Sequence, residues 1–302
     1  MHIGIKIPNW GELAGPEALV RTAVAADERG FGSVWVSDHL AMPRHPLSEY
    51  PYSRSSAPPF DASTPFVEAM LALAHVAAVT TNVQLGTGVL VLPLRHPVLI
   101  AKQAASLDVL SRGRLVLGIG VGWLADEFTL LGRSWTNRGR RTDDAIRLMR
   151  AAWAGEDVLL DELDGRPTSI AINPLPARGP AVPILIGGHS NAALRRAATL
   201  GDGWYASNIA ADDFAALVRT LRALPGGSSV TVGARPGVVE ATDASEVVAA
   251  FAAAGADYVV LDAPFGTMSV AQASEWVHRV ADSVDLSAAS TPLLAMGQAS
   301  DG

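Results

Sequence analysis

The sequence has 302 residues, is 49% hydrophobic, contains no cysteine and carries a formal net charge of −7 at pH 7. This length suits one large α/β domain, and the missing cysteines exclude disulfides, thiolate nucleophiles and cysteine metal sites. The negative charge argues against a general nucleic-acid surface, and no apolar run reaches the length of a membrane span. We therefore expect a cytoplasmic protein that binds a small molecule, with neither nucleic acid nor membrane as a partner.

Strand and helix patterns alternate along most of the chain. The first strands are predicted at residues 2–8 and 31–36, and a helix over 16–28 lies between them and ends at Gly30. Eight such alternations are what a closed (βα)8 TIM barrel with right-handed parallel crossovers requires. The other predicted strands are 83–92, 114–119, 184–186, 204–207, 229–239 and 256–263, and the other main helices are 66–79, 96–110, 142–153, 192–200, 211–224, 244–254 and 270–284.

Two stretches interrupt this alternation. Residues 40–65 show no helical or strand period and combine six prolines with Tyr50, Tyr52 and Phe60. So long a connection is uncommon unless it acts as a lid, so we predict a substrate-side lid; the alternative, a disordered insertion, is disfavoured by the aromatic residues. Residues 155–180 indicate a hairpin-like excursion. The barrel domain is thus predicted over 1–285, with both insertions at its C-terminal face, and a flexible tail over 286–302.

Polar and aromatic residues follow the first two strands, where a TIM barrel carries its chemistry. Asn9 and Trp10 follow the first strand and are predicted to bind substrate, whereas Asp38 and His39 follow the second. A carboxylate beside a histidine would orient its ring and raise its proton affinity, so His39 with Asp38 is the predicted general acid/base. The alternative is a His39 that stacks or hydrogen-bonds without moving a proton.

A second candidate site lies within residues 183–204. The apolar run 184–186 is followed by two glycines, and Ser190 with Asn191 supplies the cap of the next helix. Glycines at such a junction let the backbone approach a ligand, and the helix N-terminus favours an anion. This pattern predicts a phosphate cradle, or alternatively a tight turn that needs glycine only for its dihedral angles. The predicted cradle residues are Gly187, Gly188, His189 and Ser190.

Several motifs together resemble the bacterial luciferase-like family of flavin and deazaflavin oxidoreductases, and most closely its coenzyme F420 branch. They are SDH at 37–39, GTGVL at 86–90, LGIGVG at 117–122, GGHS at 187–190 and LGDGW at 200–204. The resemblance implies a TIM barrel, and a non-prolyl cis peptide near Gly88-Val89 that bulges toward the cofactor ring. It also implies further cofactor contacts by Thr87, Gly88, Val89, Gly120, Val121 and Gly122.

One position departs from this family. Sugar-phosphate dehydrogenases of the deazaflavin branch have a proton-donating glutamate just after the fourth strand, whereas this chain has Trp123, which we assign to the substrate. That particular mechanism is therefore in doubt. Glu127 lies one helical turn further on and could reach the site, although a first-turn glutamate also favours the helix dipole without any catalytic duty.

The resemblance implies an oxidoreductase that transfers hydride between coenzyme F420 and a small organic substrate. The alternatives are a two-component monooxygenase that uses FMN, and a non-catalytic flavin-binding protein. An arginine near the rim would suit the acidic tail of the deazaflavin. The histidines show no metal-ligand spacing, so no metal is expected.

Helices 66–79 and 96–110 are more apolar than one core-facing stripe needs, which predicts a homodimer, and in the family the same helices form the interface.

Overall fold

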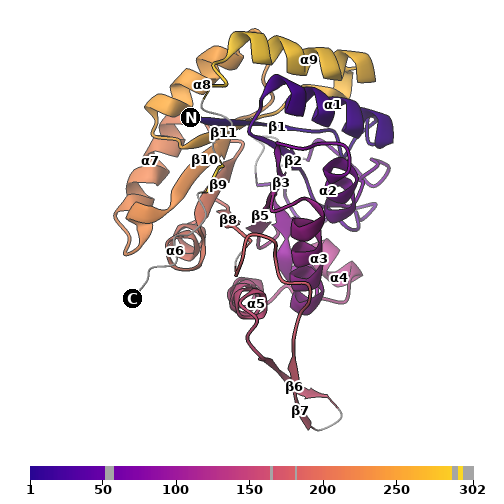
Figure 1. Cartoon of the computed structure of the whole chain (residues 1–302), viewed down its shortest axis with the longest axis vertical. Coiled ribbons are helices and arrows are strands. Elements are labelled where there is room, and N and C mark those ends of the chain that lie inside the picture. The colour runs from indigo at the N-terminus through magenta and orange to yellow at the C-terminus, as the bar shows by residue number, and fades with distance from the viewer. Residues whose placement is uncertain (52–57, 164–165, 181, 288–291, 295–302) are drawn as a thin grey trace.

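Eight parallel strands close into a ring in the computed structural model, which describes residues 1–51, 58–163, 166–180, 182–287 and 292–294. Around the ring the order is β1, β2, β3, β5, β8, β9, β10 and β11, and β11 pairs with β1. Helices cover the outside (Figure 1). The predicted (βα)8 barrel is confirmed. The strands are β1 (His2–Lys6), β2 (Ser33–Val36), β3 (Gln84–Thr87), β4 (Leu90–Val91), β5 (Leu115–Gly120), β8 (Ile184–Gly187), β9 (Gly203–Ser207), β10 (Thr231–Arg235) and β11 (Tyr258–Leu261).

The described helices follow the strands in the expected sequence. Each packs apolar residues on the sheet, as in α1 with buried Leu19 and Ala23. No helix among the described residues is long and apolar enough to cross a membrane. The main helices are α1 (Pro16–Arg29), α2 (Ala69–Ala77), α3 (Pro97–Leu110), α4 (Ala125–Leu130), α5 (Arg138–Trp153), α6 (Asn191–Leu200), α7 (Ala211–Arg222), α8 (Ala244–Ala253) and α9 (Val270–Ser283).

The third strand is interrupted where the glycines suggested a bulge. It was predicted as one run over 83–92, but β3 ends at Thr87 and β4 continues the pairing with β5 after a break. The peptide between Gly88 and Val89 in this break is cis, as the family resemblance implied. A 3-10 turn, Leu92–Leu94, then leads into α3.

Two helix boundaries were predicted wrongly. The helix expected from residue 66 begins only at Ala69, because Val67 donates its N–H to Asn9 O and accepts from Asn9 Nδ2, which holds the chain extended. Glu68 then caps α2 by accepting from Leu71 N at 3.0 Å. The helix expected from residue 142 begins at Arg138, so α5 is four residues longer at its N-terminus than predicted.

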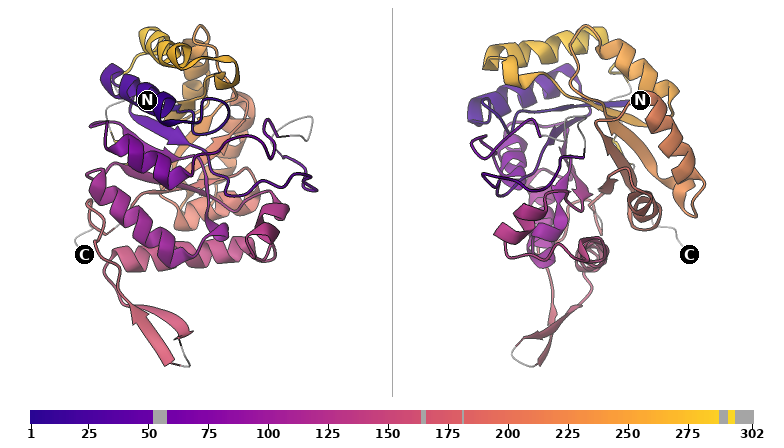
Figure 2. Two further views of the ribbon diagram at one scale, coloured as in Figure 1. Left: turned by 90° about the vertical axis from the view of Figure 1, so that its right-hand side faces the viewer. Right: turned by 180° about the vertical axis from the view of Figure 1, so that it is seen from behind.

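The insertion over 155–180 contains an antiparallel hairpin, β6 (Val158–Leu163) and β7 (Arg166–Ile170), which projects from the barrel (Figure 2). It connects the C-terminal end of α5 to the start of β8, so it lies at the N-terminal face and not at the predicted C-terminal face. Asp108, near the end of α3, fixes the returning chain by accepting from Ala177 N at 2.9 Å.

An aromatic layer fills the barrel below the strand ends. Trp35 stacks on Tyr205 and Tyr258, with ring centroids 5.4 and 6.2 Å apart. Gly86 makes room for it, since a Cβ there would lie 2.3 Å from the Trp35 ring. Leu293 joins this layer and donates its N–H to Gln84 Oε1 at 2.7 Å. The expectation of a flexible tail is therefore wrong for Leu293, which is buried; residues 288–291 and 295–302 lie outside the described part.

Candidate cofactor and substrate site

A cavity of about 690 Å³ opens at the C-terminal ends of the strands. It brings together residues that are far apart in the sequence and that belong to both candidate sites of the sequence analysis. This volume is in the range of cofactor and ligand pockets. The predicted residues that line the cavity are Trp10, Asp38, His39, Gly88, Val89, Gly120, Val121, Gly122, Trp123, Gly187, Gly188, His189 and Ser190.

The glycines of two neighbouring strands make room for the Val89 side chain. A Cβ on Gly120 would lie 2.7 Å from Val89 Cγ2, and one on Gly187 would lie 2.6 Å from Val89 Cγ1. Such contacts are too short for any side chain, so only glycine fits on either side of Val89. The bulge after β3 is thereby wedged between β5 and β8, and Val89 with the glycines around it lines the cavity, where a flat ring could lie.

The N-terminus of α6 forms the predicted cradle. Ser190 Oγ caps the helix by accepting from Ala193 N at 3.2 Å, and Gly188 has a φ of +119°, which disfavours any residue with a side chain. Two arginines line the cavity here: Arg138, whose guanidinium lies 3.5 Å from the centre of the Trp135 ring, and Arg196. Burial lowers the pKa of Arg138. Helix N-terminus and arginines together suit an anionic group, so the residues present fit a phosphate.

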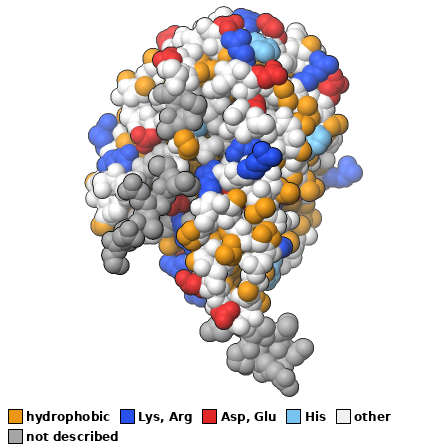
Figure 3. Space-filling view, in the orientation of Figure 1, with side chains coloured by type: hydrophobic (Ala, Val, Ile, Leu, Met, Phe, Trp, Pro, Cys, Tyr) orange, Lys and Arg blue, Asp and Glu red, His pale blue; other side chains and the backbone are white. Residues whose placement is uncertain are grey.

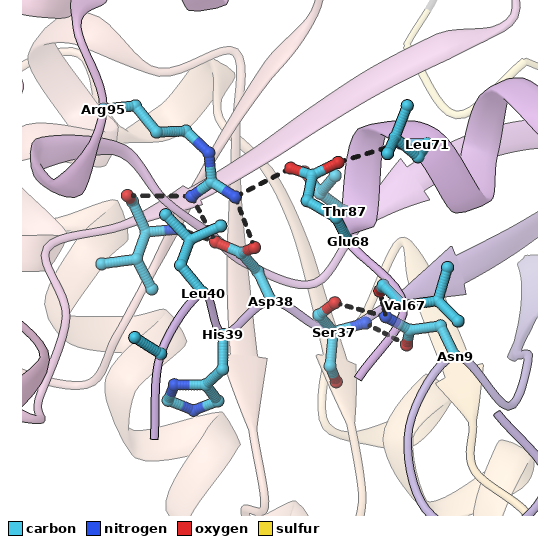
Figure 4. A network of polar contacts seen from close by, with 12 residues as sticks. Asn9, Ser37, Asp38, His39, Leu40, Val67, Glu68, Leu71, Thr87 and Arg95 are labelled. Atoms are coloured by element: carbon cyan, nitrogen blue, oxygen red, sulfur yellow. Dashed lines mark hydrogen bonds and ion pairs between the residues drawn. The ribbon is translucent and has the colours of Figure 1, made fainter. Parts of the chain in front are cut away.

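Asp38 is not the partner of His39, contrary to the prediction. Its carboxylate points to Arg95 and away from the imidazole ring (Figure 4). Arg95 donates to both Asp38 oxygens, at 2.6 and 2.7 Å, and also to Glu68 Oε1 at 2.9 Å. Asp38 also accepts from Val91 N at 2.8 Å. Successive side chains of an extended segment point to opposite sides, which is why neighbours in sequence do not meet here. Asp38 therefore supports the bulge and does not act on a proton.

The carboxylate that contacts His39 belongs to Glu127 in α4. Glu127 Oε2 lies 3.0 Å from His39 Nδ1, while Oε1 accepts from Leu40 N at 2.6 Å and Ala41 N at 3.1 Å. The Glu127 side chain is only 2% exposed. A carboxylate can only accept, so it fixes the proton of His39 on Nδ1 and leaves Nε2 for a ligand. The same side chain anchors the beginning of the lid, a role that its place in the first helical turn did not reveal.

Two further predicted site residues have structural roles instead. Asn9 is fully buried and does not line the cavity; its Nδ2 donates to Ser37 O at 2.7 Å and its Oδ1 accepts from Ser37 N at 2.9 Å. Thr87 is also buried, and its hydroxyl donates to Gly118 O at 2.7 Å. Both therefore hold neighbouring strand ends in register and contact no ligand space.

Aromatic side chains form one wall of the cavity. Trp10 stacks on Phe66 with centroids 5.8 Å apart, and Phe60 from the lid segment lies edge-on to both. Tyr50, also from this segment, meets Trp123 at 5.0 Å. The described parts of residues 40–65 thus contribute to the cavity lining, and their action as a lid stays a prediction; Tyr52 lies outside the described residues.

The lining residues that the sequence interpretation missed include Lys6, Arg235 and Asp262. Each lies at or just after the end of a strand, so the rule that identified His39 could have found them. Lys6 was hidden inside an apolar run, and its inward direction depends on the strand register. No cluster of side chains suited to a metal ion occurs among the residues that the structure describes.

The fold and the site by themselves define a class: a TIM barrel with a ligand cavity at the carboxyl ends of its strands, where enzymes of this fold carry their active sites. Residues 1–291 match the sequence profile described as Luciferase-like monooxygenase. The chain therefore belongs to that family of enzymes.

Named relatives include oxidoreductases. The F420-dependent glucose-6-phosphate dehydrogenase of Nakamurella multipartita is 37% identical over 197 residues, which cover 64% of this chain and 52% of that protein. Across this and other curated relatives, the chain spans between 40% and 62% of the length of the protein that it matches.

Two solved structures share the fold. The monooxygenase RslO1 from Streptomyces bottropensis has a TM-score of 0.71 at 22% identity, and the matched region covers 94% of this chain and 98% of that one. The coenzyme F420-dependent tetrahydromethanopterin reductase from Methanopyrus kandleri has a TM-score of 0.69 at 15% identity, with the same coverage.

Proposed function

We propose that this enzyme is a coenzyme F420-dependent oxidoreductase that transfers hydride between the deazaflavin and a small organic substrate. The observation that carries the proposal is one cavity that joins the glycine-flanked Val89 bulge, a helix N-terminus flanked by arginines, and a histidine oriented by a buried carboxylate. The relatives named as F420-dependent dehydrogenases support it.

In this proposal the cradle holds the cofactor phosphate. The N–H groups of the first turn of α6 and the hydroxyl of Ser190 face it, and the backbone at Gly120 and Val89 supports the ring. When bound, the reduced deazaflavin supplies the hydride. Arg138 is our assignment for the arginine that meets the acidic tail, because it lies at the cavity beside Gly122 and carries no carboxylate partner among the described residues.

His39 handles the proton that accompanies the hydride. Glu127 holds the ring by Nδ1, so Nε2 donates a proton to the substrate oxygen or carbon in the reduction and accepts it in the reverse reaction. Trp10, Phe60 and Trp123 exclude water from the reacting atoms, which strengthens each electrostatic contact inside the cavity.

Binding of the two candidate cofactors tests the proposal. We expect F420 to bind at low micromolar Kd or tighter and FMN at least about 10-fold more weakly, measured by calorimetry or fluorescence. Arg138→Met should weaken F420 about 5-fold and FMN little, whereas Arg140→Met, a solvent-exposed neighbour, should change neither. Tight FMN binding without a response to F420 would replace the proposal with the FMN-dependent monooxygenase.

We also propose that the chain forms a homodimer through α2 and α3. Large apolar side chains on these helices are exposed: Leu71 by 68%, Leu99 by 52% and Leu110 by 71%. Hydrophobic side chains gather on the lower right of Figure 3, the region where Figure 1 places α3. A patch of this kind marks an association surface. Light scattering at micromolar concentration should give the mass of two chains, and a monomeric mass would contradict the proposal.

A further inference from the structure

A separate group of charged side chains lies in the same cavity, apart from the cradle and from His39. Lys6 ends β1, Arg235 ends β10 and Asp262 follows β11. Lys6 Nζ donates to Ser37 Oγ at 2.7 Å and lies 3.8 Å from Asp262 Oδ2. Arg235 Nη1 donates to the same Asp262 oxygen at 2.6 Å. Two cations therefore share one carboxylate oxygen.

This charged group lacks one negative charge. The side chains of Lys6, Asp262 and Arg235 are 4%, 8% and 13% exposed, so water screens them poorly. Among the described lining residues the only other carboxylate is that of Asp38, which Arg95 already binds. Arg235 Nε has no hydrogen-bond partner in the described part of the chain. A buried charge without compensation is costly, so an entering anion would be stabilised here.

The protonation equilibrium of Lys6 also favours an anion at this position. Burial lowers the pKa of Lys6 to about 8, although Asp262 acts to raise it and Arg235 to lower it further. The other groups that face the ammonium are neutral: the hydroxyl of Ser37, and the ring of Trp10 with its centroid at 5.6 Å. An anion beside Lys6 would raise this pKa, so anion binding near pH 8 should be accompanied by proton uptake.

Trp10 connects this charged group to the aromatic wall. Its ring contacts the Lys6 ammonium and stacks on Phe66, with Phe60 edge-on beside it. One small molecule could therefore touch cations at one end and flat apolar surface at the other.

We propose that the substrate is a small carboxylic acid with a flat apolar body, whose carboxylate binds between Lys6 and Arg235 while its body lies against Trp10. This inference deepens the proposed function and rests on it for the hydride step. Its binding part is independent of the cofactor.

The test compares two probes of the same shape, 3-phenylpropanoate and 3-phenylpropanamide, by calorimetry on the protein with and without F420. We expect the carboxylate to bind at least 10-fold more tightly than the amide in both states. Lys6→Met should reduce this preference to 3-fold or less while leaving the amide affinity and the F420 affinity within 2-fold. Lys102→Met, which removes the other lysine of the chain at an exposed position, should keep the full preference.

A second readout is the proton balance. At pH 8, calorimetry in triethanolamine and in Tris, two buffers without a buffering anion, should show that wild-type protein takes up part of a proton with the carboxylate, whereas Lys6→Met takes up none. This measurement on wild-type protein remains decisive if Lys6→Met does not fold.

Three results would each overturn the proposal. They are equal affinities for the carboxylate and the amide, a carboxylate preference that is unchanged in Lys6→Met, and carboxylate binding without proton uptake. If the carboxylate preference disappeared only when F420 is bound, the charged group would belong to the cofactor site, and the proposal would also be overturned. An intact carboxylate preference in a protein that does not bind F420 would refute the proposed function and uphold the carboxylate site.

Discussion

The two walls of the cavity are built in opposite ways. The cradle is made from one short stretch, Gly187 to Ser190, whose backbone would bind the phosphate in the proposed function. The opposite wall is a network of side chains from distant parts of the chain, in which Asp38 meets Arg95 and His39 meets Glu127. In the cradle, removal of the Ser190 hydroxyl should give only a graded loss, although Gly187 and Gly188 admit no side chain. A wall of buried charges should fail at one change, because each partner left alone keeps its desolvation cost.

The largest expected effect is therefore on stability, at Arg95. Arg95→Met leaves the Asp38 carboxylate, 0% exposed, without its partner, so the free energy of unfolding should fall by about 3–5 kcal/mol in urea titrations. Arg21→Met removes an exposed ion pair with Glu17 and should cost about 0–1 kcal/mol. If Arg95→Met and Arg21→Met lowered the free energy of unfolding by similar amounts, the expected contrast between the two walls would be wrong.

The next largest effect is expected at His39. His39→Ala should lower kcat about 10²-fold, with F420 affinity changed less than about 3-fold, because Nε2 acts on the proton and not on the phosphate. The measurement is the consumption of reduced F420 with any substrate that the enzyme turns over. An unchanged kcat would return His39 to a stacking role.

Glu127 should have a smaller effect than the histidine that it orients. Glu127→Gln keeps the size of the side chain but can no longer accept from three donors, so kcat should fall about 10-fold with KM little changed. Asp126→Asn is the matched control. Among the described residues, the Asp126 carboxylate accepts from Leu47 and Ser48 of the 40–65 segment and not from His39. A larger kcat loss in the control than in Glu127→Gln would show that the lid, not His39, limits turnover.

The smallest effect is expected in the cradle. Ser190→Ala removes a helix cap and should cost about 1 kcal/mol of stability, together with an F420 affinity loss of about 3-fold. Ser269→Ala removes the cap of α9, which lies outside the cavity lining, and should give the same stability loss with unchanged Kd. If both variants weakened F420 equally, the contact of Ser190 with the phosphate would be excluded.

The contrast between the walls also explains what the sequence could predict. The strand, the glycines and the capped helix of the cradle could be predicted because they are contiguous and carry their own periodicity and cap, whereas the phosphate that they would hold stays a prediction. The partner of His39 was assigned wrongly because adjacency was taken for contact, although extended backbone turns Asp38 and His39 to opposite sides. Glu127 meets His39 only through the packing of α4, 88 residues away, and nothing in the local pattern of either segment reports that distance.

The closed ring of strands limits how far the protein can fold during translation. β1 takes β2 as one neighbour early, but its other neighbour is β11, with His2 opposite Tyr258. A nascent chain must therefore carry an unpaired edge on β1 until the last strand has left the exit tunnel. The buried layer that contains Trp35 also lacks Leu293 until that residue has been synthesised. The barrel therefore closes only after β11 has been synthesised, and chains that stall before that point should depend on chaperones that shield strand edges.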